Sequence, residues 1–205
     1  MMKCTYDIHP AVAYSEAVLR NLATSTGRSL RQWLRVIEDC GYSGEKEIAR
    51  WLKAEHNLGA TTAKLLASRA CRPLDGRSGA ERYLENATAY VDAMYAGKKS
   101  HLRPIHDHLV EVGRSFGKAV RVCPCRTIVP LYREHVFAEI KPATQKRIDL
   151  GLALRHSERE LPDRIHATRG LKLGDRITHR IVLECTDDVD EFVCGWMGYA
   201  YELDR

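Results

Sequence analysis

The spacing of apolar residues changes from a helical to a strand period near residue 119, and this change constrains the fold more than any other feature. Before it, Leu30, Trp33, Leu34 and Ile37 recur at intervals that place them on one face of a helix. After it, short alternating or β-branched runs are separated by Pro, Gly or charged clusters. The sequence therefore predicts helices followed by a sheet.

The first third of the chain predicts four short helices. Pro10 suits a first helical position, and Gly27 ends the apolar stripe that follows it. Ser29 is a good N-cap for the second helix, and the third ends near Asn57. An alanine-rich helix then covers about 61–70. We expect a small all-α bundle built around two tryptophans.

The best linker candidate is the segment 72–79, in which Pro and Gly interrupt the helical period. We therefore predict a helical bundle domain over residues 1–72 and a second domain over 73–205. Ser78 and Glu81 have the S-x-x-E spacing of a capping box, so a helix should begin there. It should end at Gly97, and a second helix of the pair should end at Gly117.

Five short runs then predict strands. They are residues 119–123, 127–132, 136–140, 147–154 and 177–185. Ile148 and Leu150 alternate with polar residues, as do His179 and Ile181, so each strand should have one apolar face. A last helix should follow Thr186. The predicted class is α+β, with a mostly antiparallel sheet of four or five strands packed against helices.

Composition and charge narrow the functional classes. The 205 residues are 44% hydrophobic, and they contain neither a transmembrane run nor a secretion leader, so we expect a cytoplasmic protein without membrane contact. Seven scattered cysteines favour reduced thiols over disulfides. Residues 114–180 contain 15 basic and 7 acidic side chains, whereas 187–205 contains six acids and one arginine. This uneven distribution of charge is compatible with two interpretations: a basic surface that binds a phosphate-bearing partner, or an ordinary solvated surface.

Two groups of motifs resemble an uncharacterised bacterial two-domain family. The first is Thr26-Gly27-Arg28-Ser29 with the run W-L-K-A-E-H-N-L-G over 51–59, and the second is R-I-D-L-G-L over 147–152 with T-H-R over 178–180. The resemblance implies the two-domain arrangement and a cytoplasmic bacterial setting, and it brings no activity or cofactor. Asn57 stands where the family pattern has Gly, and Asn also tolerates a positive φ.

Common catalytic motifs are missing from the sequence. It has no G-x-S-x-G elbow, no phosphate-binding P-loop and no G-x-G-x-x-G fingerprint, so we predict no cofactor and no catalytic nucleophile. Thr61, Thr62, Lys64 and Arg69 could belong to a recognition helix of a helix-turn-helix. That helix is mostly alanine and leucine, which favours packing inside the bundle.

Two weaker patterns concern metals. Glu139 and Lys141 match the E-x-K of magnesium-dependent nucleases, in which a carboxylate holds the metal and a lysine orients water, but no aspartate lies between Gly117 and Glu139. Cys123-Pro124-Cys125 fits neither a zinc nor a redox spacing. We predict no metal site, and we expect His101, His106 and His108 to face solvent.

Polar residues on the predicted sheet form the main candidate site. The candidate ligand-binding residues are Arg126, Arg133, Lys141, Arg147, Asp149, Thr178 and Arg180. Strand alternation puts Arg147 with Asp149, and Thr178 with Arg180, on faces opposite the apolar residues. If these faces align, guanidinium groups could bind a phosphate; otherwise they form a salt-bridged solvent face.

We therefore expect a non-enzymatic binding module for an anionic partner, nucleic acid or a phosphate-bearing ligand, acting through the basic face of the sheet. One alternative is a magnesium-dependent nuclease that uses Glu139 and Lys141. The other is a protein-interaction adaptor whose helical domain is the docking piece. The oligomeric state is not predicted.

Overall fold

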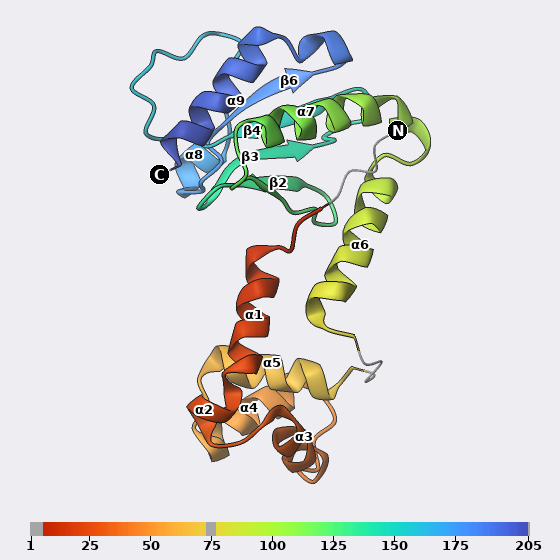
Figure 1. Cartoon of the computed structure of the whole chain (residues 1–205), viewed down its shortest axis with the longest axis vertical. Coiled ribbons are helices and arrows are strands. Elements are labelled where there is room, and N and C mark those ends of the chain that lie inside the picture. The colour runs from red at the N-terminus through yellow and green to blue at the C-terminus, as the bar shows by residue number, and fades with distance from the viewer. Residues whose placement is uncertain (1–5, 73–76, 205) are drawn as a thin grey trace. The chain divides into compact units, whose positions relative to one another are not determined.

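A computed structural model describes residues 6–72 and 77–204 and divides them into two compact units. The helical unit comprises residues 10–72 and 77–82, and the α+β unit comprises residues 6–9 and 83–204. Figure 1 shows the elements of each unit. The predicted boundary between residues 72 and 73 adjoins the stretch 73–76, which lies outside the described residues, and it stays a prediction.

The helical unit contains the helices that the first third of the sequence predicts. They are α1 (Pro10–Arg20), α2 (Leu22–Thr26), α3 (Leu30–Glu38), α4 (Glu45–His56) and α5 (Ala60–Ala70). The one predicted helix that starts at Pro10 is thus two, because the chain turns at Asn21 between α1 and α2. Leu22, Trp33, Ile48 and Leu52 form the centre of a single apolar core.

Local sequence signals set the ends of these helices. Ser29 caps α3 as predicted: its hydroxyl accepts from the backbone N–H of Gln32 at 3.4 Å, and the Gln32 amide oxygen accepts from Ser29 N at 2.8 Å. Asn57 caps α4 in the left-handed conformation with φ +50°, as its place in the family pattern predicts. Ala63, Leu66 and Ala67 of α5 are fully buried, so this helix packs in the bundle on more than one side.

The α+β unit has helical segments before, within and after its strands, and residues 79–82 at the start of the first of them belong to the helical unit. The segments are α6 (Gly79–Met94), η1 (Gly97–Leu102), α7 (Arg103–Ser115), α8 (Gly170–Leu173), η2 (Thr186–Asp188) and α9 (Glu191–Leu203). The capping box at the start of α6 is confirmed, because Ser78 N donates to Glu81 at 2.8 Å and Glu81 N donates to Ser78 Oγ at 3.1 Å. The start of α9 uses Asp190, whose carboxylate accepts from Val193 N at 3.0 Å.

The sheet of this unit is antiparallel and has six strands in the order β1-β2-β3-β4-β6-β5. The strands are β1 (Arg121–Val122), β2 (Val129–Tyr132), β3 (Val136–Lys141), β4 (Ile148–Leu152), β5 (His166–Ala167) and β6 (His179–Leu183). The α+β class is confirmed, and the sheet has one strand more than the upper figure of the predicted four or five. The extra strand, β5, has two exposed residues, so no apolar alternation signals it.

The core of the α+β unit lies between the sheet and its helices. Figure 1 shows α7 and α9 lying across one side of the sheet. Gly113 of α7 allows the close packing there, since a Cβ at this position would lie 2.2 Å from Leu131 Cδ2 and 3.1 Å from Met197 Cε. Leu131, Ile140, Leu150 and other apolar residues of this side form one buried cluster with these helices. We call it the apolar face of the sheet, and the opposite side its polar face.

The residues before α1 pack with the sheet. Asp7 N donates to Val122 O at 2.9 Å, and the Asp7 carboxylate accepts from Val122 N at 2.8 Å and from Arg114 at 2.7 Å. This pairing fixes residues 6–9 beside β1, far from their place in the sequence. Among the described residues, none of the helices has both the length and the apolar character needed to cross a bilayer.

Candidate anion-binding site

The register of the central strands determines which charged residues share the polar face. Lys141 of β3 is the partner of Asp149 in β4, and Asp149 is in turn the partner of Val182 in β6. In the neighbouring row, Gly151 lies between Glu139 and Arg180. Because side chains alternate along each strand, these two rows point to the same side of the sheet. Three of the candidate residues, Lys141, Asp149 and Arg180, are thus brought together.

Asp149 holds two guanidinium groups on this face. Its Oδ2 accepts from Arg180 Nη1 at 2.6 Å, and its Oδ1 lies 3.1 Å from Arg147 Nε. Asp149 is nearly buried, with 12% of its side chain exposed, whereas both arginines are about one-third exposed. A guanidinium carries five N–H donors, so both arginines retain donors beyond those used by Asp149. The pairing therefore orients two cations without occupying them fully.

Glu139 lies in a more enclosed part of the polar face. Gly151 leaves room there for Ile177, whose Cγ2 would lie 2.6 Å from a Cβ at position 151. Burial raises the pKa of the Glu139 carboxyl, and the charge of Lys141 partly opposes this shift. The carboxylate in the facing strand, Asp149, is already paired with arginines. Within the described residues, no three His, Cys, Asp or Glu side chains gather where they could hold a metal ion.

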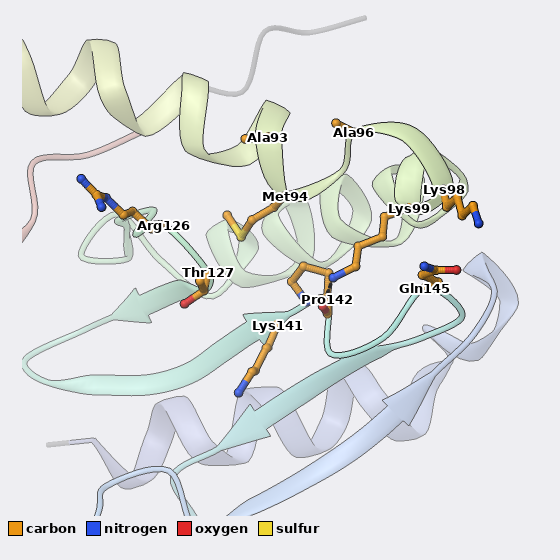
Figure 2. A pocket seen from close by; sticks show the side chains of 10 residues that line it. All are labelled: Ala93, Met94, Ala96, Lys98, Lys99, Arg126, Thr127, Lys141, Pro142 and Gln145. Carbon is orange, nitrogen blue, oxygen red and sulfur yellow. Dashed lines mark hydrogen bonds between the residues drawn. The ribbon is translucent and has the colours of Figure 1, made fainter.

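A pocket of about 580 Å³ lies at the end of the sheet where β3 passes into the connection to β4 (Figure 2). Its lining combines the C-terminal end of α6, η1, the loop before β2 and the end of β3. The residues are Ala93, Met94, Ala96, Lys98, Lys99, Arg126, Thr127, Lys141, Pro142 and Gln145. We call this hollow the basic pocket.

The basic pocket is lined by four cationic side chains, and no carboxylate is among its described lining residues. Figure 2 shows Arg126 and Lys98 at opposite ends, with Lys99 and Lys141 between them. Lys99 is held in place because its Nζ donates to Pro142 O at 2.7 Å. Lys141 belongs to both the pocket and the polar face, so the two basic areas are continuous through this residue.

Lys98 and Lys99 are the two cationic residues of the pocket lining that the sequence prediction missed. They form a basic pair directly after the turn at Gly97, which has φ +60°. Such a pair has no partner that can be recognised in the sequence, because the contact of Lys99 with Pro142 spans 43 residues. Only the folded chain brings η1 to the end of β3.

Two predicted site residues lie elsewhere. Arg133 follows β2 and precedes β3, whereas the pocket lies at the other end of β3. The Arg133 guanidinium lies 4.5 Å from the ring centre of Tyr201 and donates to Tyr201 O at 3.1 Å. Thr178 precedes β6 and is fully buried. Its hydroxyl accepts from Leu154 N at 3.3 Å and lies 3.0 Å from Nδ1 of His179. Both side chains support the fold around them.

The cysteines and histidines that the sequence singles out differ in their burial. Burial raises the pKa of the Cys123 thiol to about 12 and also raises the pKa of Cys125. His101 and His108 are exposed as predicted, but His106 is fully buried, so that prediction was wrong for His106. Burial, with a smaller contribution from the charge of Arg103, lowers the pKa of His106 to about 3.

The fold and the site define a two-domain protein in which a small helical domain precedes an α+β domain. The family described as Domain of unknown function (DUF5655) matches residues 91–204, more than half of the chain, and the chain belongs to this family. The family described as Domain of unknown function (DUF4287) matches residues 15–71. The uncharacterised two-domain family predicted from the motifs is thereby confirmed. Searches of curated proteins and of solved structures found no match.

Proposed function

We propose that the α+β unit binds a phosphate-bearing ligand in the basic pocket. The observation that carries this proposal is the composition of the lining, to which Lys98, Lys99, Arg126 and Lys141 contribute four cationic side chains while no described lining residue is a carboxylate. Figure 2 shows the charged ends of Arg126, Lys98 and Lys141 directed to different sides of the hollow, and an anion bound among them would be attracted by each. None of the four forms an ion pair with the described part of the chain, although the charge of Lys141 acts on Glu139 and Lys99 Nζ donates to Pro142 O.

The shape and remaining lining of the pocket agree with a ligand larger than a single phosphate. Its volume of about 580 Å³ falls in the range of small-molecule sites. Met94 and Pro142 supply apolar walls, while Thr127 and Gln145 add neutral hydrogen-bonding groups. Because the cations are spread along the hollow, an extended ligand with several negative charges gains more from them than a compact one.

The polar face extends this basic area. Beyond Lys141, the two guanidiniums held by Asp149 offer donors of the type that grip phosphate oxygens in pairs. A ligand with several phosphates, or a nucleic-acid strand, could leave the pocket along this row. The proposal concerns binding and contains no catalytic step.

The test uses the full chain with two probes, inorganic pyrophosphate and a short fluorescein-labelled single-stranded oligonucleotide. We expect the Arg126→Gln/Lys141→Gln double variant to lose about tenfold or more in affinity, since it removes two of four charges. Lys172→Gln, an exposed position in α8 outside the pocket, is the matched control and should bind as the unaltered chain does. Affinity should also fall as salt rises.

The two probes separate the sources of the phosphate. Tight binding of pyrophosphate that competes with the oligonucleotide identifies a small phosphate ligand, and tight binding of the oligonucleotide alone identifies a nucleic acid. Equal affinity of the double variant and the Lys172→Gln control for both probes would overturn the proposal. Binding that does not weaken with salt would do the same.

A further inference from the structure

A second hollow, of about 680 Å³, lies entirely within the helical unit. It is bounded by α1, the start of α3, α5 and residues 77–79. It therefore belongs to a different unit from the basic pocket. We call it the Arg-rimmed groove, after the residues described below.

The floor of this groove is aliphatic. Val12 and Leu19 of α1, Leu30 of α3 and Leu65 of α5 line it, and all four are only partly buried. Helix α1 is apolar over much of its length, yet none of its residues is fully buried. Partly exposed aliphatic side chains that meet in a hollow are typical of a surface that binds a partner, since scattered ones would not line a common groove.

The rim of the groove is strongly basic. Arg20, Arg69, Arg72 and Arg77 contribute to it, and Glu16 is the one acidic residue among the described lining. The Glu16 carboxylate already accepts from Gly79 N at 2.6 Å, so it is engaged by the backbone of the opposite wall. Arg20 of α1 on one side, and Arg69 and Arg72 at the end of α5 on the other, therefore place positive charge on both sides of an apolar floor.

We propose that the Arg-rimmed groove binds an amphipathic helix of a partner protein, with aliphatic residues on one face and Asp or Glu residues flanking them. Burying aliphatic side chains of a partner on the apolar floor is favourable, and a nucleic-acid backbone has no such side chains. The arginines of the rim attract Asp and Glu side chains at the edges of the partner helix and repel Lys side chains there. Laying the apolar face of a helix into such a groove is a common mode of peptide recognition. This inference does not depend on the proposed function of the α+β unit.

The test uses the full chain and two synthetic helical peptides with the same leucine pattern, one with glutamates and one with lysines at the flanking positions. Fluorescence anisotropy should show binding of the acidic peptide and at least about a tenfold preference over the basic one. The Arg20→Glu/Arg72→Glu variant should weaken binding of the acidic peptide by about tenfold or more. Arg50→Glu, an exposed position in α4 outside the groove, should leave it unchanged.

A substitution in the floor checks the apolar part. Leu65→Asp should abolish binding of the acidic peptide, and circular dichroism confirms that the helices remain. Should Leu65→Asp unfold the unit, the milder Leu65→Ser takes its place with the same expected loss. Equal binding of both peptides, or no effect of the Arg20→Glu/Arg72→Glu variant, would overturn the proposal. An oligonucleotide that binds through the same arginines while the acidic peptide does not would also overturn it.

Discussion

Arg180 of β6 donates to Asp149 of β4 at 2.6 Å, and this ion pair joins two neighbouring strands on the polar face. Arg147 lies against the other oxygen of the same carboxylate at 3.1 Å. One acidic residue thus balances two cations next to the basic pocket. Because the Asp149 carboxylate is more enclosed than either guanidinium, we expect its loss to lower the stability of the fold as well as to affect binding.

The first prediction concerns the loss of this carboxylate charge. Asp149→Asn should lower the free energy of unfolding by about 1–2 kcal/mol, since it leaves two adjacent guanidiniums without their shared partner. The value lies at the low end for such changes because solvent screens the partly exposed arginines. Urea denaturation followed by circular dichroism measures it. Asp163→Asn, at an exposed position, is the control and should change stability by less than about 0.5 kcal/mol; equal effects of the two would contradict the prediction.

The second prediction concerns Asp204 at the end of α9. This carboxylate is 1% exposed, accepts from His135 N at 2.8 Å and is paired with Arg176. It therefore ties the end of the last helix to the turn between β2 and β3. Asp204→Ala should lower the free energy of unfolding by about 1–3 kcal/mol because these hydrogen bonds are lost. Glu202→Ala, an exposed position in the same helix, should have little effect, and thermal unfolding of the two variants provides the comparison.

Local signals explain why much of the fold could be predicted. The caps at Ser29, Ser78 and Asn57 depend on residues within a few positions, so the sequence contains the whole interaction. Alternation likewise places Asp149 and Arg180 each opposite the apolar residues of its own strand, and the register of β4 with β6 then puts them on one face. Features of this kind need no knowledge of distant contacts.

The missed features depend on long-range contacts or on strand ends. Alternation places Thr178 on the face of Arg180, but Thr178 lies one residue before β6 begins, and it is buried there. Lys99 reaches Pro142 only after the helices and the sheet have packed. His106 is different, because it lies four residues after Leu102 and three before Leu109, both of them buried. The helical spacing therefore predicts a buried position at His106, despite the polarity of its side chain.

The third prediction follows from the burial of His106. Its pKa lies near 3 in the folded chain against an ordinary 6.5, so the unfolded chain binds the extra proton between these values. Stability should therefore fall as pH drops from about 6.5 toward about 3, by up to about 1.4 kcal/mol for each pH unit from this residue. Below that window the contribution stays constant.

The comparison that isolates His106 uses His106→Leu, which cannot titrate. The free energy of unfolding of this variant, measured by urea denaturation at pH 7 and pH 5, should fall less with acid than that of the unaltered chain. His108→Gln changes an exposed histidine of the same helix and should keep the original slope. Parallel profiles for His106→Leu and the unaltered chain would show that His106 carries no such linkage.

The fourth prediction compares two glycines that lie inside helices. A methyl group at Gly113 of α7 would lie 2.2 Å from Leu131 Cδ2, so Gly113→Ala should push the helix from the apolar face of the sheet and lower stability by about 1–3 kcal/mol. At Gly195 of α9, nothing lies within 4 Å of the added carbon, and Gly195→Ala should raise stability by about 0.5–1 kcal/mol through helix propensity. Thermal unfolding should therefore shift in opposite directions for the two variants. If both variants unfold at a higher temperature, α7 does not pack against Leu131 as closely as the structure places it. If both unfold at a lower temperature, Gly195 is constrained by more than its own helix.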